Sequence, residues 1–332
     1  MSFQILCLSG GGYLGLYSIA LLSELERQTG GRIASRFDLL AGTSIGGIVA
    51  LALAAEVPAE KIQSAFEQNG QAIFGSRPPA RSGFAVFTDL CRNAFKSKYS
   101  ADALRSTIVD VVGADLRVGE LRHPVLVPAI NLSKGSPQVF KTPHHETFRL
   151  DLNLRVADVA MATSAAPTYF PLAEIGDAMY TDGGLYANSP DLLALHEATY
   201  FFKQPESDIR LLSIGTTTAQ FSFAHAANKH FGIVQWFRGS RLLNVIIASQ
   251  QRSVDFMMKH RLAANYLRLD ETQSKEQEQV LGLDVATQDA QRTIRALASG
   301  TAQRAINEPL LRTMLQHTAP APKFFHAVTP VT

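Results

Sequence analysis

Hydrophobic positions in the first third of the chain alternate between strand-like and helix-like patterns. Phe3–Leu8 is a short apolar run that predicts a buried strand, and Leu16–Gln28 carries apolar residues at helical spacing. Phe37–Ala41 predicts a second buried strand, and Ile45–Ala55 predicts a very apolar helix behind it. This β-α-β-α order predicts an α/β fold, in which helices cover both faces of a mainly parallel sheet.

The rest of the chain predicts more strands and then a mainly helical region. The predicted strands and one short helix (Val156–Thr163) cover the middle of the chain, the strands being Val125–Asn131, Gln138–Lys141, Met179–Thr181 and Arg210–Ile214. Beyond residue 225 the pattern predicts mainly helix, through Trp236–Arg261 and Thr287–Ala305. We therefore expect one catalytic domain over residues 1–305, followed by a C-terminal helix and an extended tail over residues 306–332.

Two segments inside this domain depart from the alternating pattern. Residues 75–100 contain a Pro- and Arg-rich loop and are a candidate lid. Residues 225–262 form a predicted helical insertion, in which the part from His225 to Arg261 carries six basic residues against Asp255 alone. A basic amphipathic helix suits an anionic lipid surface, whereas an ordinary helix would pack its apolar residues on the core. Both interpretations of this segment stay open.

Composition and charge narrow the class of protein. The chain has 332 residues, of which 46% are hydrophobic and 18% charged, as in a globular protein. Its net charge of +2 argues against a DNA or RNA polymer as partner. Two cysteines cannot form a four-ligand metal site by themselves, and we expect neither a metal nor another cofactor. The uncharged stretch between Asp38 and Glu56 is shorter than the ~20 apolar residues that span a bilayer.

A glycine cluster follows the first predicted strand and has two interpretations. Gly10, Gly12 and Gly15 fit the G-x-G-x-x-G pattern of a dinucleotide site. That site needs an acidic residue at the end of the second strand, whereas Asp38 stands at the start of it. Alternatively, the N–H groups of Gly10, Gly11 and Gly12 could point into one concavity and bind a developing oxyanion.

The second predicted strand leads into a motif for a nucleophile. Gly42-Thr43-Ser44-Ile45-Gly46 is a G-x-S-x-G elbow between a buried strand and an apolar helix. Gly42 and Gly46 are expected to be required because side chains there would collide with the neighbouring strand or helix. The sharp turn would hold the hydroxyl of Ser44 above the sheet, at the positive end of the helix.

A serine nucleophile needs a base, and the sequence favours a carboxylate over a histidine. In a triad hydrolase with this elbow the histidine follows the acid, but none of the later histidines stands on an obvious strand-end loop. Asp182 comes directly after a short apolar strand and is followed by Gly183 and Gly184, which leave room around its side chain. An ordinary Asp-Gly turn would give the same letters, but together with the two upstream motifs this pattern indicates a partner for Ser44.

Taken in order, these motifs resemble those of the patatin-like phospholipase family. The segment Gly10–Gly15 is similar to its oxyanion loop, Gly42–Gly46 to its nucleophile elbow, and Asp182–Gly184 to its catalytic Asp-Gly motif. The resemblance implies a three-layer α/β/α fold with a helical C-terminal extension. It also implies a phospholipase that cleaves glycerophospholipid acyl esters through an acyl-enzyme, with Asp182 accepting the proton of Ser44 directly. Many relatives carry Arg or Lys where this chain has Leu14, which bears on head-group preference.

The layout of one such domain with a helical extension also resembles the phospholipase effectors of cyclic-oligonucleotide (CBASS-type) antiphage systems. This resemblance implies a cyclic di- or trinucleotide activator, a membrane phospholipid substrate and a cytoplasmic protein that associates peripherally with the inner face of the membrane. A homo-oligomer is a further expectation. The alternatives are a soluble carboxylesterase or thioesterase on the same dyad, and a catalytically silent lipid-binding sensor.

Overall fold

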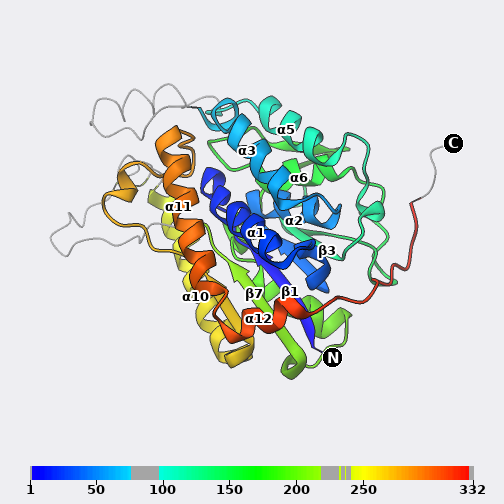
Figure 1. Ribbon diagram of the computed structural model, residues 1–332. Helices are drawn as coiled ribbons and strands as arrows, with labels where there is room; N and C mark the ends of the chain where they lie inside the picture. Colours follow the sequence, from blue (N-terminus) through cyan, green and yellow to red (C-terminus); the bar gives the residue numbers. More distant parts are fainter. Residues whose placement is uncertain (1, 76–96, 218–231, 233–235, 237–240, 329–332) are drawn as a thin grey trace.

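A computed structural model describes residues 2–75, 97–217, 232, 236 and 241–328 of the chain. These residues form an eight-stranded sheet with helices packed on both faces (Figure 1). Most of the candidate lid (residues 75–100), and the greater part of residues 225–240 of the predicted insertion, lie outside the described residues. The predicted three-layer α/β/α architecture is confirmed.

The sheet is parallel at its centre and antiparallel at one side. Its parallel part runs in the order β3-β2-β1-β7-β8, with bounds Val125–Asn131, Leu39–Gly42, Phe3–Leu8, Ile209–Ile214 and Tyr266–Leu269. Strands β4 and β6 both pair antiparallel with β3, and β5 pairs with β6; their bounds are Ser136–Lys141, Ala178–Asp182 and Ala173–Ile175. Because parallel neighbours β1 and β2 end at the same edge, the loops after them lie close together.

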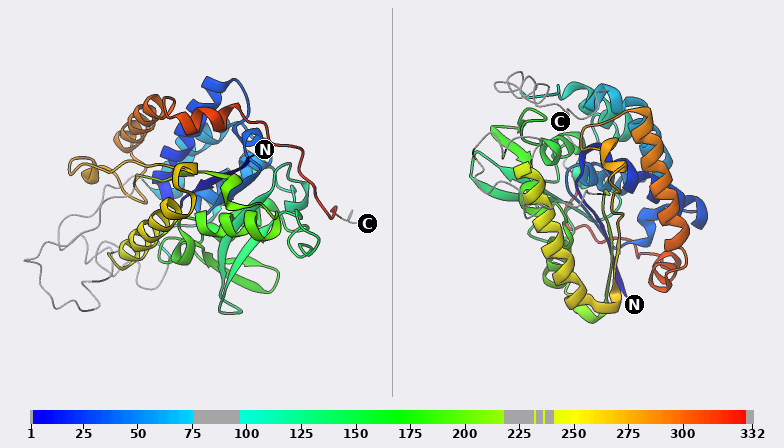
Figure 2. Two further views of the ribbon diagram at one scale, coloured as in Figure 1. Left: turned by 90° about the horizontal axis from the view of Figure 1, so that it is seen from below. Right: turned by 90° about the vertical axis from the view of Figure 1, so that its left-hand side faces the viewer.

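Alternate residues of β1 point into two separate hydrophobic cores, which explains why the strand is apolar throughout. Leu6 and Leu8 pack with the larger core, to which α1, α2, α3 and α11 contribute; these helices span Leu16–Thr29, Ile45–Ala54, Ala59–Phe74 and Gln288–Ala305. Ile5 and Cys7 face the other core, with α8 and α10, which span Asp191–His196 and Arg241–Leu262. Figure 2 shows α10 and α11 on opposite faces of the sheet.

The remaining helices complete the larger layer and the sheet edge. Helices α5 and α6 pack on α3 and α2 respectively, the short α7 follows β6, and α12 lies beside the start of the chain; their bounds are Asp102–Val112, Val156–Ser164, Gly184–Ala187 and Pro309–Gln316. Residues 317–328 then run over the surface without regular structure (Figure 2). There the N–H of Ala319 donates to the Ser35 carbonyl at 2.8 Å, and that of Phe325 to the Pro143 carbonyl at 2.8 Å. The division of the chain at residue 305 stays a prediction.

Two strands were not predicted. Beyond residue 225 the pattern indicated mainly helix, yet Tyr266–Leu269 forms β8 and pairs parallel with β7. Four residues that include Arg268 are too short and too polar to produce a strand pattern, and β5 has only three residues. Their extended conformation comes from pairing with a neighbouring strand, which the local sequence does not reveal.

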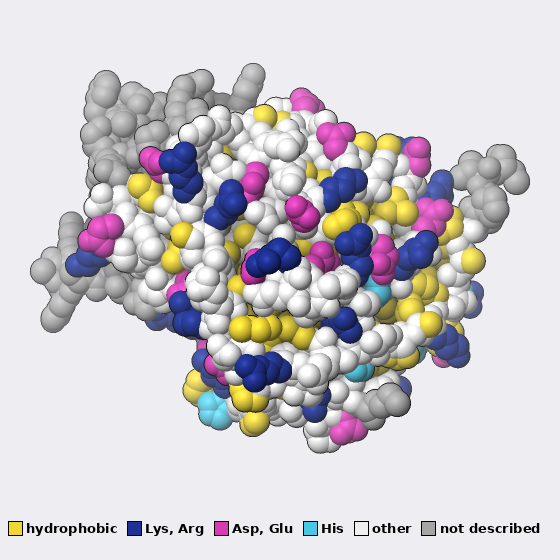
Figure 3. All heavy atoms as spheres, viewed as in Figure 1, with side chains coloured by type: hydrophobic (Ala, Val, Ile, Leu, Met, Phe, Trp, Pro, Cys, Tyr) yellow, Lys and Arg dark blue, Asp and Glu magenta, His cyan; other side chains and the backbone are white. Residues whose placement is uncertain are grey.

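The distribution of surface charge and the lengths of the helices are relevant to whether the chain could bind an anionic partner or cross a membrane. On the face seen in Figure 3, basic and acidic side chains are interspersed among the described residues, with hydrophobic side chains between them. Within the described ranges, no helix has both the length and the apolar character needed to cross a membrane.

Candidate active site

Ser44 lies at the corner between β2 and α2, in a strained backbone conformation. Its φ is 56° and its ψ −126°, which a non-glycine residue rarely adopts outside such functional turns. A Cβ atom on Gly42 would lie 2.0 Å from the carbonyl oxygen of Gly46, and one on Gly46 would lie 2.3 Å from that of Leu8. The elbow therefore closes only with glycine at both positions. Its backbone is further fixed by Thr163, whose hydroxyl accepts the Ser44 N–H at 3.0 Å.

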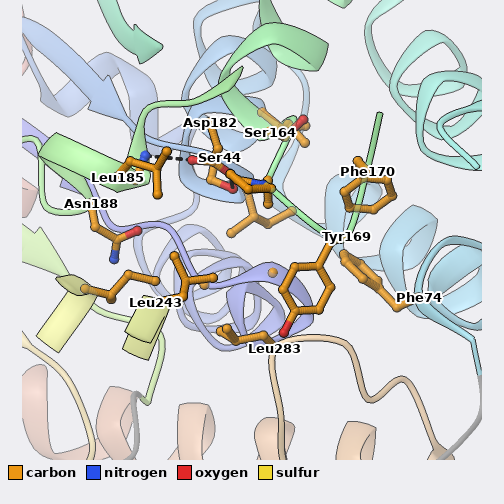
Figure 4. A pocket seen from close by; sticks show the side chains of 18 of the residues that line it. Ser44, Phe74, Ser164, Tyr169, Phe170, Asp182, Leu185, Asn188, Leu243 and Leu283 are labelled. Atoms are coloured by element: carbon orange, nitrogen blue, oxygen red, sulfur yellow. Dashed lines mark hydrogen bonds between the residues drawn. The ribbon is translucent and has the colours of Figure 1, made fainter. Parts of the chain in front are cut away.

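The structure brings Ser44 and Asp182 into direct contact. The hydroxyl of Ser44 donates a hydrogen bond to Oδ2 of Asp182 at 2.7 Å (Figure 4). The other carboxylate oxygen, Oδ1, accepts the backbone N–H of Gly184 at 2.7 Å, while Gly183 is the N-cap residue of α7. Asp182 is the last residue of β6, and only 8% of Ser44 and 5% of Asp182 is exposed. Two residues 138 positions apart are thus held in the geometry of a nucleophile and its base.

Burial sets the proton affinity of this carboxylate. Desolvation raises the pKa of Asp182 to about 6, and the hydrogen bonds from Ser44 and Gly184 offset only part of the rise. A carboxylate with a raised pKa is a stronger base toward an alcohol than an exposed aspartate. At neutral pH it is still mostly ionised, so it can accept the proton of Ser44.

We expect hydrolysis to depend on pH through this single group. Because only the ionised carboxylate can accept the proton, kcat/KM should fall about tenfold per pH unit below pH 6 and level off above pH 7. Initial rates measured from pH 4.5 to 8.5 on a water-soluble ester, which avoids pH effects on a lipid surface, would show this. A profile that is flat between pH 5 and 8 would contradict the assignment of Asp182 as the base.

Two of the three predicted N–H donors of the glycine loop remain candidates in the structure. Gly11 and Gly12 line the same cavity as Ser44, and their N–H groups have no acceptor among the described residues. The N–H of Gly10 instead donates to the Asn188 carbonyl at 3.0 Å, so the inclusion of Gly10 as an oxyanion donor is corrected. The main-chain carbonyl of Gly10 accepts hydrogen bonds from Asn188 Nδ2 and Thr216 Oγ1, both at 3.1 Å. Gly10 thus anchors the loop, and Gly11 and Gly12 remain as the candidate oxyanion donors.

Asp38 shows why the glycine loop is not a dinucleotide site. Its carboxylate accepts the N–H of Gln4 at 2.7 Å and faces His317. Gln4 lies at the start of β1, whereas Gly10 follows its end. The only acidic candidate for a ribose contact thus lies at the opposite edge of the sheet from the loop.

The cavity above the dyad is mostly apolar and narrow. Aromatic side chains of Phe74, Tyr169 and Phe170 lie at one side of it, and Leu243 of α10 lies at the other side (Figure 4). Ile247 of the same helix also lines the cavity. None of the described residues that line the cavity is a histidine. Its volume of about 60 Å³ has room for a few water molecules but not for an acyl chain. An apolar lining suits a lipid, but the cavity must widen before one can enter.

Two residues that position the site, Thr163 and Asn188, were not among the predicted site residues, although Ala162–Pro171 and Asn188–Pro190 also resemble segments of the patatin-like family. Asn188 binds Gly10 through both its side chain and its backbone, and Thr163 links the Ser44 N–H to the Pro128 carbonyl, to which its hydroxyl donates at 2.6 Å. Neither residue is a nucleophile or a base, so its side-chain chemistry alone does not indicate a role at the site. Asn188 lies six residues after Asp182, directly after the short helix α7, and this closeness in sequence is the signal that indicates a place near the site.

Comparison with known proteins agrees with this geometry. A family model described as patatin-like phospholipase matches residues 6–195, which include the glycine loop, Ser44 and Asp182. The chain belongs to this family. It is 40% identical to a cGAMP-activated phospholipase of Pseudomonas aeruginosa over 98% of this chain and 95% of that protein. A cGAMP-activated phospholipase of Vibrio cholerae is 36% identical over 92% of this chain and 91% of its own length. A cUMP-AMP-activated phospholipase of Escherichia coli is 29% identical, with 64% of each chain covered.

Membership of the patatin-like phospholipase family accounts for the site but not for the whole chain. The family match ends at residue 195, whereas α10, β8 and α11 come later in the chain. The Pseudomonas aeruginosa and Vibrio cholerae relatives align with more than nine-tenths of this chain, and therefore also with this later part. The later part is thus shared with those proteins, and it includes α10, which supplies one wall of the cavity above Ser44.

Proposed function

We propose that this protein is a phospholipase that hydrolyses acyl esters of membrane glycerophospholipids at Ser44, and that a cyclic dinucleotide switches it on. One observation carries the chemistry: Ser44 and Asp182 share a 2.7 Å hydrogen bond at the base of an apolar cavity. Gly11 and Gly12, whose N–H groups have no acceptor among the described residues, line the same space. A nucleophile, a base and an oxyanion site are thereby present together.

Acylation begins when Asp182 takes the proton of Ser44 as the Ser44 oxygen attacks the ester carbonyl. The carbonyl oxygen becomes negatively charged in the tetrahedral intermediate, and the N–H groups of Gly11 and Gly12 stabilise it together with the positive end of α2. As the intermediate collapses, protonated Asp182 returns its proton to the leaving alcohol, which is the lysophospholipid. Ser44 then carries the acyl group.

Deacylation repeats these steps with water as the nucleophile. Asp182 accepts a proton from the water as it attacks the acyl carbonyl, and the Ser44 oxygen leaves and is reprotonated by Asp182. One free fatty acid is released in each cycle. A single carboxylate can serve both halves because it lies within hydrogen-bonding distance of Ser44 and its ionised form is the resting one at neutral pH.

Control by a cyclic dinucleotide is supported by the names of the similar proteins and by the narrow cavity. Three of the relatives are called cGAMP-activated phospholipases. The space above Ser44 in this structure is too small for an acyl chain, as expected of an enzyme at rest. A role in antiphage defence, a cytoplasmic location with peripheral membrane association, and a homo-oligomer stay predictions.

A lipid-product analysis tests this proposal. Vesicles of phosphatidylethanolamine and phosphatidylglycerol are incubated with the full chain, with and without cyclic GMP–AMP, and the products are identified by mass spectrometry. We expect free fatty acid and lysophospholipid to appear at least tenfold faster with the nucleotide, and the Ser44→Ala variant to produce neither. Hydrolysis of a short-chain soluble ester but not of vesicles would point to a carboxylesterase or thioesterase. Lipid binding without any hydrolysis would point to a silent sensor.

A further inference from the structure

A second and larger cavity lies between α10 and the loop after β8. Its volume is about 520 Å³, and its lining is largely polar. Three basic residues (Arg252, Lys259 and Arg268) and three acidic residues line it, the acidic ones being Asp255, Asp270 and Glu271. Tyr266 adds an aromatic ring to the wall. Lys259 pairs with Asp255 and Arg268 with Asp270, both at 2.7 Å, and Glu271 pairs with Arg304. Among the described residues Arg252 has no ion pair, so it is the cation of this cavity that is left for a ligand.

Several buried polar groups around this cavity lack a partner. Gln251 is only 7% exposed, and its side-chain Nε2 has no hydrogen-bond acceptor in the part of the chain that the structure describes. Asp255 Oδ1 and both carboxylate oxygens of the buried Asp191, which faces Arg268, are likewise without a donor there. Buried amides and carboxylates normally form hydrogen bonds, so these groups indicate a missing partner.

We propose that this polar cavity is the binding site of the activating nucleotide. This inference rests on the proposed function, because it places the activator of that same reaction. Arginine and lysine pair with phosphate oxygens. The carboxylates can accept the N–H groups on the edge of a purine base. A simple inorganic anion would pair with the basic side chains but would be repelled by the carboxylates. A nucleotide uses both.

Helix α10 lines both this cavity and the catalytic one. Leu243 and Ile247 face the space above Ser44, whereas Gln251 and Arg252 face the polar cavity one turn further along. Between them, the side chain of Gln250 donates to the Leu185 carbonyl at 2.6 Å and accepts the Asn188 N–H at 3.2 Å. A ligand that moves α10 therefore moves the wall of the catalytic cavity.

A chain of hydrogen bonds joins the floor of the polar cavity to the glycine loop. Arg268 Nη2 pairs with Asp270 at 2.7 Å, and Arg268 Nη1 donates to the hydroxyls of Ser213 and Ser189 at 2.9 and 3.1 Å. The hydroxyl of Ser189 is in turn 3.1 Å from that of Ser9, which directly precedes Gly10. A phosphate that draws Arg268 toward it would alter this chain. Nucleotide binding thus has two routes to the reacting centre, through α10 and through Arg268.

Two arginines of α10 allow a matched test on the full-length chain. Both are exposed, but Arg252 lines the polar cavity and Arg261 pairs with Glu206 away from it. Binding of cyclic GMP–AMP is measured by calorimetry for the wild type, for Arg252→Ala, for Lys259→Ala and for the control Arg261→Ala. Loss of one charge-assisted contact should raise Kd about 10- to 100-fold in the first two variants. The Arg261→Ala variant should bind as the wild type does.

A second measurement follows α10 itself. Hydrogen exchange with and without cyclic GMP–AMP should change across Arg241–Leu262, and the change should be absent in Arg252→Ala at the same nucleotide concentration. Equal Kd values for all four proteins would overturn the proposal, as would a wild type that binds no nucleotide. The Ser44→Ala variant is expected to bind normally. Nucleotide binding that depends on Arg252, without hydrolysis of any lipid, would instead retain this site and reject the phospholipase reaction.

Discussion

Replacing Asp182 with asparagine is expected to lower kcat on phospholipid by about 10⁴-fold or more. In other serine hydrolases, a comparable loss follows when the base, or the carboxylate that orients it, is replaced. Asparagine has nearly the shape of aspartate and can still accept the Gly184 N–H that Oδ1 now accepts at 2.7 Å. It cannot accept the proton of Ser44. Fatty-acid release from nucleotide-treated vesicles measures the effect.

The same variant should be more stable than the wild type at high pH, which separates loss of chemistry from loss of fold. The folded-state pKa of Asp182 is about 6, above its usual 3.8, so ionisation disfavours the folded state. This penalty is complete above pH 6 and vanishes below about pH 4, and the shift corresponds to roughly 3 kcal/mol at most. In urea unfolding, Asp182→Asn should therefore have a higher free energy of unfolding than the wild type at pH 8. At pH 4 the two free energies should differ little.

Residual activity would change the interpretation. If Asp182→Asn kept more than about one-hundredth of the wild-type rate while Ser44→Ala kept none, another base would have to act on Ser44. A variant that is inactive and also less stable at pH 8 would indicate a structural role for the carboxylate. Only loss of activity together with a gain in stability supports Asp182 as the base.

The residues at the reacting centre could be predicted from sequence because tight geometry restricts them. The elbow admits only glycine at 42 and 46, since any side chain would meet a backbone carbonyl within 2.3 Å or less. The strand–glycine–helix order also fixes the edge of the sheet at which Ser44 and Asp182 lie. Such constraints act on the local chain, so they appear as motifs. The central strands and the helices between them could be predicted for the same reason, since each repeats its apolar pattern over several residues.

What the sequence did not reveal depends on contacts between distant segments. The N–H of Gly10 donates to the carbonyl of Asn188, and the sequence around Gly10 does not predict this hydrogen bond. Strand β8 is extended because it pairs with β7. For α10, the sequence left a choice between a lipid surface and the core, whereas Leu243 and Ile247 lie over Ser44. In each case the role of the segment is determined by the distant residues that it contacts, and not by its own sequence.

Replacing Gly12 with alanine should lower kcat about 10²- to 10³-fold, the usual effect of losing one oxyanion donor. Gly12 has a φ of +55°, and a Cβ atom there would lie 2.1 Å from the carbonyl oxygen of Leu283. That carbonyl accepts the Tyr13 N–H at 2.8 Å and so holds the loop in place. The added methyl group must push the loop away from Leu283, and the N–H groups of Gly11 and Gly12 would then no longer point at the reacting carbonyl. Single-turnover rates on vesicles measure the loss.

Gly30 provides the matched control for backbone strain alone. It ends α1 with a φ of +69°, close to that of Gly12, and a Cβ atom there would meet nothing within 4 Å. Alanine at position 30 should therefore cost about 1 kcal/mol of stability, as an L-residue does in the left-handed region, without slowing hydrolysis. Equal loss of activity in both variants would mean that strain alone explains the effect of Gly12→Ala. Loss in Gly12→Ala only would tie the oxyanion site to the position of the glycine loop against Leu283.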